Sequence, residues 1–147
     1  MVESLQQELT KKGYKFMYLQ NQSIMPADDG KSFDFSQIQT DADAILFVYI
    51  YSVGYHAPEG FDKTYYPKLT VSVNLYDERS KTPIYRKIFT ILRSKKYYGA
   101  KYSEIMIPDT DFYYDSIDAL MSNIDEAAQG IIDFQGKIAA RIAEQLK

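Results

Sequence analysis

The chain has 147 residues, of which 46% are hydrophobic and 25% are charged, and its formal net charge at pH 7 is -3. These values are typical of a globular domain, and they argue against a disordered chain and a strongly basic nucleic-acid binder. Cysteine is absent, which excludes a disulfide framework, thiolate catalysis and cysteine-based zinc or iron–sulfur sites. We therefore expect one domain over residues 1–147, with one continuous core.

The amino terminus predicts a surface helix followed by a strand. Val2, Leu5 and Leu9 recur at helical spacing, and Gly13 suits the end of a helix over residues 2–12. The aromatic stretch YKFMYLQ, residues 14–20, then predicts a strand. Residues 21–40 read as a long loop whose central KSFDFSQIQ holds a turn or two of helix.

The stretch DADAILFVYIYSVGYH, residues 41–56, is the most apolar part of the chain. Its uncharged run from Ala44 to Tyr55 is too short for a transmembrane helix, which needs about 20 residues. Aromatic and aliphatic side chains occupy both alternating faces, so both faces are expected to be covered. The pattern predicts a central strand of the sheet, not an edge strand.

The second half of the chain predicts a hairpin and then helices. Residues 66–94 alternate as two antiparallel strands around the polar turn DERSKTP, and residues 95–115 read as irregular. Helical periodicity then predicts helices at 116–121 and 124–146, with Asn123 and Glu126 forming a capping box. The expected fold class is α+β: one mixed, mainly antiparallel sheet of about four strands, with an N-terminal helix and a long C-terminal helix packed on one face.

Few residues suggest catalysis or metal binding. His56 is the only histidine, and no G-x-S-x-G motif accompanies it. DTDFYYD, residues 109–115, resembles the start of a calcium loop but lacks its glycine and its final glutamate. A metal-dependent enzyme or binder using His56 with Asp62 or with these carboxylates is an alternative, while the first expectation is no enzyme, no metal and no cofactor.

Two groups of surface residues are candidates for binding. RSKKYYGAKY, residues 93–102, is the one basic patch, and it either guards a strand end or binds an anionic ligand. The net charge of -3 does not favour nucleic acid as a partner, and no phosphate-binding glycine loop supports nucleotide binding. Exposed tyrosines make good contact surfaces. The candidates for partner binding are Tyr97, Tyr98, Tyr102, Tyr113 and Tyr114, and those for an anionic ligand are Arg93, Lys95, Lys96 and Lys101.

Four segments resemble a family of bacterial envelope proteins. They are LQQELTKKGYKF, DADAILFVYI, YPKLTVSVNLYDERSKTPIYRKIF and AAQGIIDFQGKIAARIAEQLK. Together they are similar to cell-envelope lipoproteins whose domain is like the amino-terminal domain of TolB and the CsgG curli-secretion lipoproteins. The resemblance spans most of the chain, and its motifs specify a fold better than an activity.

This resemblance implies a non-enzymatic, periplasmic domain that contacts other envelope proteins during envelope assembly or secretion. It also implies anchoring to the outer membrane through a lipid alone, with no transmembrane segment. Family members begin with a signal peptide, a lipidated cysteine and a first strand, which this chain lacks, so we expect either that these precede it or that the sheet has an open edge. An open edge would favour a homo-oligomer through strand pairing.

Overall fold

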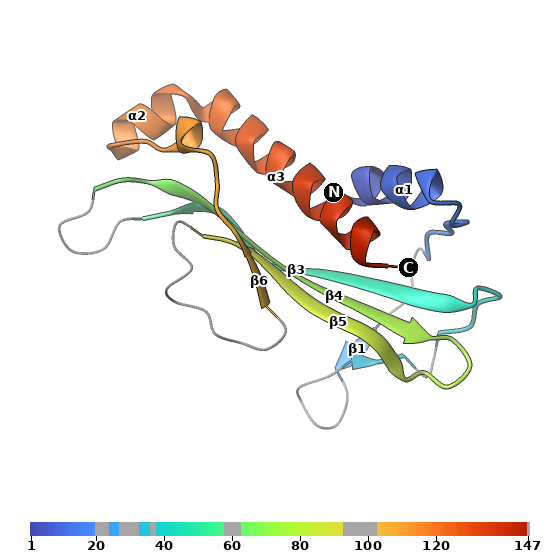
Figure 1. The fold of residues 1–147 in the computed structure, drawn as a ribbon. Coiled ribbons are helices and arrows are strands. Elements are labelled where there is room, and N and C mark those ends of the chain that lie inside the picture. Colours follow the sequence, from blue (N-terminus) through green and yellow to red (C-terminus); the bar gives the residue numbers. More distant parts are fainter. Residues whose placement is uncertain (20–23, 27–32, 36–37, 58–62, 93–102, 147) are drawn as a thin grey trace.

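A computed structural model describes residues 1–19, 24–26, 33–35, 38–57, 63–92 and 103–146 (Figure 1). The helices are α1 (Val2–Lys11), α2 (Ile117–Ser122) and α3 (Ile124–Gln145), and a short 3₁₀ turn, η2 (Thr110–Phe112), precedes α2. The strands are β1 (Met25–Pro26), β2 (Phe33–Asp34), β3 (Ala44–His56), β4 (Tyr66–Asp77), β5 (Pro83–Ile91) and β6 (Ser103–Met106). The expected α+β class is confirmed.

The main sheet has the strand order β3-β4-β5-β6. β3, β4 and β5 are antiparallel neighbours, whereas β6 pairs with β5 in parallel, so the sheet is mixed and mainly antiparallel as predicted. The hairpin of β4 and β5 confirms the alternating pattern of residues 66–94. β6 was not predicted: it has only four residues, and it lies within residues 95–115, which were expected to be irregular.

Both α1 and α3 lie on one face of this sheet, called the helix face here (Figure 1). Apolar side chains that alternate along β4 and β5 meet those of the helices, because every second residue of a strand points to the same face. The core between the two layers contains Leu5, Leu9, Leu69, Val71, Val73, Phe89, Ile91, Phe134, Ile138, Ala139, Ile142, Ala143 and Leu146. The predicted packing of both helices on one face is therefore confirmed.

The prediction that residues 41–56 form a central strand is wrong. Among the described residues β3 pairs only with β4, so it is an edge strand of the main sheet, and the central position belongs to β4 and β5. The alternation of β3 was predicted correctly: Leu46 and Val48 pack against the core of the helix face, and Phe47 points to the opposite, far face. The apolar far face had suggested a covered strand, but cover is provided at only one end of it.

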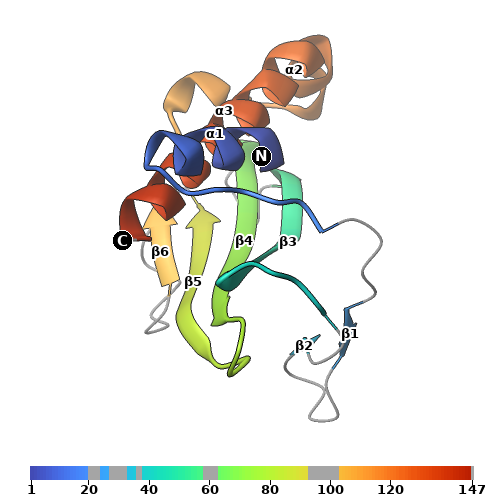
Figure 2. The same cartoon turned by 90° about the vertical axis from the view of Figure 1, so that its right-hand side faces the viewer.

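That cover comes from the segment between α1 and β3. A second cluster, called the far-face cluster here, contains Phe35, Ile38 and Ile45, against which Leu19, Ile24, Phe47 and Tyr76 pack. The segment holds β1 and β2, which pair antiparallel. The turn of helix expected within residues 31–39 falls partly outside the described residues, and the backbone N–H of Ile38 donates to the Phe35 carbonyl at 3.0 Å. The predicted strand over 14–20 is absent from 14–19, because Phe16 packs on the helix-face core while Leu19 reaches the far-face cluster. This stretch passes from one face of the sheet to the other, and it pairs with none of the described strands (Figure 2).

The predicted pair of C-terminal helices is confirmed, but its capping differs. Ser116 caps α2, since its Oγ accepts a hydrogen bond from the backbone N–H of Ala119 at 3.1 Å. Asn123 makes no side-chain cap for α3; its Nδ2 instead donates to the carbonyl of Ala119 at 2.8 Å. The capping box of Asn123 with Glu126 is therefore not formed, and Asn123 ends one helix as it starts the next.

Candidate functional site

The outer edge of β3, beyond which no described strand lies, is the candidate functional site. β3 has 13 residues and pairs with β4 along its length, while no strand of the described part of the chain lies on its other side. Every second residue of an edge strand directs its backbone N–H and C=O away from the sheet, where another chain can pair with them. From Ala44 to Tyr55 the strand carries no charged residue. It therefore lacks the charges that commonly prevent edge-to-edge pairing.

Exposed apolar side chains gather on the second half of this strand. The large hydrophobic residues Tyr49, Ile50, Tyr51 and Val53 are all exposed, and Tyr51 and Val53 each retain 57% of their accessible surface. Phe47 and Tyr49 stack with ring centroids 6.4 Å apart, and Tyr51 meets Tyr49 edge to face at 4.8 Å. These aromatic contacts extend outward from the far-face cluster, where Phe35 meets Phe47 at 5.4 Å.

A β-bulge lies within this exposed half. The pairing register with β4 shifts between Ile50 and Ser52, so that Tyr51 is the extra residue. A bulge bends its strand and increases the local twist, which re-aims the side chains next to it. Beyond the bulge the alternation is shifted by one residue, so Val53 pairs with Leu69, whose side chain lies in the helix-face core. Gly54 follows with a φ of 146°, a backbone conformation that residues with a side chain rarely adopt.

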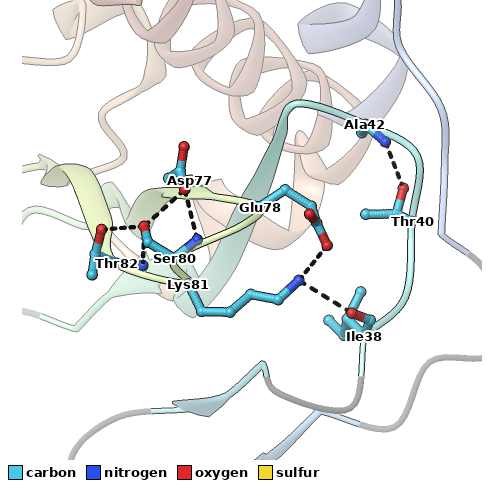
Figure 3. Close-up of polar contacts among 8 residues, drawn as sticks. All are labelled: Ile38, Thr40, Ala42, Asp77, Glu78, Ser80, Lys81 and Thr82. Carbon is cyan, nitrogen blue, oxygen red and sulfur yellow. Dashed lines mark hydrogen bonds and ion pairs between the residues drawn. The ribbon is translucent and has the colours of Figure 1, made fainter.

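The covered end of β3 is held by polar contacts of the β4–β5 turn (Figure 3). Lys81 Nζ donates to the Ile38 carbonyl at 3.2 Å and pairs with Glu78 at 2.6 Å. The turn itself is closed by Asp77, whose Oδ1 accepts bonds of 2.7 Å from the backbone N–H and the hydroxyl of Ser80. These hydrogen bonds hold the pKa of Asp77 below its usual value. The 24–38 segment is thus tied to the sheet near Ile45, and the exposed half of β3 lies beyond it.

Tyrosines and His56 fill the other end of β3. His56, its last residue, is half buried, and its ring lies 5.2 Å from that of Tyr66. The Tyr55 hydroxyl donates to the Ala127 carbonyl of α3 at 3.4 Å, and its ring packs against that of Tyr114. Burial, with a further contribution from Tyr114, raises the pKa of Tyr55 well above its usual range. Its phenol therefore stays protonated at neutral pH, where it acts as a donor and not as a base.

The structure separates the tyrosines that were predicted to bind a partner. Tyr114 is only 7% exposed, and its backbone bridges to Tyr65, so its side chain belongs to the interior and not to a contact surface. Tyr113 is half buried, with its ring 6.1 Å from that of Tyr66. The other three predicted contact residues and the four cations of the basic patch lie outside the described residues: Tyr97, Tyr98, Tyr102, Arg93, Lys95, Lys96 and Lys101.

The carboxylates considered for a metal site do not converge in the described part of the chain. Asp109, Asp111 and Asp115 are all exposed, and Asp109 pairs with Lys137 at 2.7 Å. No group of three or more histidine, aspartate or glutamate side chains that could hold a metal ion occurs among the described residues. Asp62, the proposed partner of His56, lies outside them. Beside His56 there is an open pocket of about 220 Å³, lined by residues 52–57 and Lys68.

The exposed residues of β3 were missed as site residues because the strand was placed in the centre of the sheet. One sequence signal could have found them. Ser52, Gly54 and His56 alternate at the end of this apolar strand, so one of its faces is polar there, whereas a strand covered on both faces is expected to be apolar on both. The absence of charge from Ala44 to Tyr55 is the second signal, since it is compatible with a covered strand and also with an edge that pairs with another chain.

The fold and this site define an α+β domain whose sheet ends in a long edge strand, β3, that is uncharged from Ala44 to Tyr55 and has no described strand beyond it. Comparisons with protein-family models, curated proteins and solved structures give no match. None of the helices in the described residues is both long enough and apolar enough to cross a membrane.

Proposed function

We propose that this chain is a non-enzymatic domain that acts through protein–protein contacts, by adding a strand of another chain to the edge of β3. One observation carries the proposal: no described strand lies beyond β3, and its second half exposes the large apolar side chains of Ile50, Tyr51 and Val53. In strand addition the main-chain hydrogen bonds supply affinity, and alternate side chains supply specificity. Tyr51 and Val53, the most exposed of these side chains, would lie beside the added strand.

The opposite edge of the sheet, formed by β6, is shorter and carries a charge. β6 has only four residues and carries Glu104, which binds Arg141 of α3 at 2.6 Å and Gln145 at 2.7 Å. Pro108, which has no backbone N–H, follows two residues after the strand. A short strand with a charged residue and a nearby proline is a protected edge. The contrast favours β3 as the edge that pairs.

A second copy of the chain is the occupant that β3 suits best. Two copies of one strand can pair antiparallel about a twofold axis, so that each residue faces its counterpart at a fixed register. Like charges directly opposite one another destabilise such a pair. Because β3 is uncharged from Ala44 to Tyr55, no register within this run brings like charges together.

The resemblance to envelope lipoproteins supports a place for this contact in the cell. We propose that the domain works in the periplasm, held at the outer membrane by a lipid anchor of the precursor. There it would contact other envelope proteins during assembly or secretion, with the β3 pair as its oligomeric form. The segments that carry the resemblance include the first half of β3, all of β4 and most of β5.

Size-exclusion chromatography with light scattering tests the proposal. The native chain is expected to change from monomer to dimer as its concentration rises, and Val53→Lys is expected to remain monomeric, because edge lysines oppose strand pairing. Met17→Lys is the matched control: Met17 is also 57% exposed, but it lies outside every strand. A native chain that stays monomeric at millimolar concentration would refute the dimer, as would a dimer that Val53→Lys leaves intact.

A further inference from the structure

A second apolar surface lies on the helices, away from β3. Ile117 and Met121 are four residues apart in α2, and Ile124, Ala128 and Ile132 follow at intervals of four in α3. Met121, Ile124 and Ile132 are 59%, 51% and 56% exposed. We call these five residues the helix stripe. Large apolar residues that are exposed together, and not singly, indicate an interaction surface.

The helix stripe lies to one side of the residues that face the core. Leu120 of α2 and Ala127 of α3 are buried together with Tyr114. Successive residues of a helix are rotated by about 100° about its axis. Met121 follows the buried Leu120 in α2, and Ala128 follows the buried Ala127 in α3, so both are rotated away from the core in the same direction. The stripe residues of the two helices therefore belong to the same side.

Further along α3, this same side is already covered by a helix. Ala139 and Ala143 continue the spacing of the stripe, and they are buried in the core that they share with α1. The Met1 amino group donates to Gln135 Oε1 at 3.0 Å, and the Tyr14 hydroxyl donates to the Leu146 carbonyl at 3.2 Å. α1 therefore lies beside α3 from Gln135 to its end and leaves α2 and the first half of α3 uncovered (Figures 1 and 2).

Acidic residues flank the helix stripe. Each isoleucine of the stripe is followed by an aspartate, in the pairs Ile117-Asp118, Ile124-Asp125 and Ile132-Asp133, and all three aspartates are exposed. Because each aspartate lies 100° beyond its isoleucine, the three carboxylates lie on one flank of the stripe. Residues 109–136 contain seven acidic residues and no lysine or arginine, although the net charge of the whole chain is only -3.

We propose that the helix stripe binds a basic amphipathic helix of another protein, which lies on α2 and the first half of α3 as α1 lies on the second half. Its apolar face would cover Met121, Ile124 and Ile132, and its lysine or arginine side chains would meet the aspartates on the flank. Binding of an amphipathic helix to an apolar groove or face is a common mode of recognition. This inference does not depend on pairing at β3.

Charge is the reason for choosing this occupant. The described helices of a second copy do not supply it, because α1 holds two glutamates against one lysine, and α3 is itself acidic in its first half. An anionic membrane surface would be repelled by the row of aspartates. A cationic helix gains from both the apolar stripe and the carboxylates, and its association is steered by the acidic surface.

Fluorescence anisotropy with synthetic peptides tests the apolar half of the proposal. The probe is a labelled amphipathic helix of leucine and lysine, about 18 residues or roughly five turns long. It is expected to bind the native chain, and the double variant Ile124→Ser, Ile132→Ser is expected to bind at least tenfold more weakly. Ile84→Ser is the control, since Ile84 is an isoleucine of β5 that is 62% exposed. Equal binding by the double variant, with its helical content confirmed by circular dichroism, would overturn the proposal.

The charge half is tested with a second peptide and a second pair of variants. A leucine and glutamate peptide with the same apolar face is expected to bind at least tenfold more weakly than the lysine probe. Asp118→Asn with Asp125→Asn is expected to weaken binding of the lysine probe and to flatten its salt dependence. Asp41→Asn with Asp43→Asn changes the net charge equally, away from the stripe, and is expected to have less effect. Equal binding of the lysine and the glutamate peptide would refute a basic partner. So would self-association of the native chain that the double variant Ile124→Ser, Ile132→Ser abolishes, because the stripe would then bind a second copy.

Discussion

Gly130 and Gly136 of α3 are expected to respond in opposite ways to the same substitution. Alanine is favoured over glycine within a helix by about 1 kcal/mol, so each change to alanine carries the same intrinsic gain. A Cβ at position 136 meets nothing within 4 Å, whereas a Cβ at position 130 would lie 2.5 Å from Cδ1 and 2.8 Å from Cγ of Phe112. Only at Gly130 must a neighbour move.

The size of the effect follows from how Phe112 is held. Its ring meets that of Phe134 edge to face at 5.7 Å, and Phe134 is only 1% exposed, so the ring is packed between α3 and the core. Overpacking of this kind destabilises by about 1–3 kcal/mol. After the intrinsic gain is subtracted, Gly130→Ala is expected to destabilise the fold by up to about 2 kcal/mol. Gly136→Ala is expected to stabilise it by about 1 kcal/mol.

Urea denaturation followed by far-ultraviolet circular dichroism measures both free energies of unfolding. A double-mutant cycle assigns the cause: with Phe112→Ala already present, Gly130→Ala should become stabilising, because the ring that it meets has been removed. If Gly130→Ala alone stabilises the chain as much as Gly136→Ala does, the close contact of η2 with α3 is refuted.

Three further predictions concern electrostatics, capping and the turn before β5. Burial opposes ionisation of Glu104, but hydrogen bonds from Arg141 and Gln145 outweigh it and lower the pKa of this carboxyl in the folded chain. The ionised carboxylate therefore stabilises the fold at pH values above the pKa that Glu104 has in the unfolded chain. This stabilisation is lost as the pH falls through the lower pKa of the folded chain. Glu104→Gln should therefore lower the free energy of unfolding by about 1 kcal/mol at pH 7 and by progressively less below about pH 4, and a pH-independent loss would contradict this reasoning. Ser116→Ala should destabilise by about 1 kcal/mol through loss of the α2 cap, and more than Asn123→Ala; the reverse order in thermal unfolding would restore Asn123 as the important cap. Lys81 has a φ of 53°, so Lys81→Gly should relieve backbone strain while removing its bond to Ile38; a stabilised variant would show that this bond contributes less than the strain.

Most of the regular elements were predictable because local pattern and final packing agree. The stripe of Leu5 and Leu9 faces the core, the hairpin alternates as its burial requires, and α3 buries one side along its length. For residues 14–19 local pattern and packing disagree. Their aromatic alternation is that of a strand, yet Phe16 and Leu19 pack in clusters on opposite faces of the sheet, and that connection decides the conformation.

The site was harder to predict than the fold, because a strand's position in a sheet is not a local property. Phe47 and Tyr49 look alike in the sequence, but Phe47 packs in the far-face cluster while Tyr49 is exposed beyond it. Which of the two is covered depends on Phe35 and Ile38, residues of the long loop whose course the sequence does not reveal. The exposure of the helix stripe was not predicted for the same reason, since a periodic apolar pattern does not show how far α1 extends along α3.

Hydrogen–deuterium exchange in β3 tests strand addition most directly. The outward amides of residues 50–55 should exchange rapidly in dilute solution and become protected as the concentration of the chain rises, since pairing with a second copy would give them hydrogen-bond acceptors. Val53→Lys should keep them unprotected at every concentration. If exchange in this segment is independent of concentration, or if protection arises only at residues 117–132, β3 is not the edge at which two copies meet.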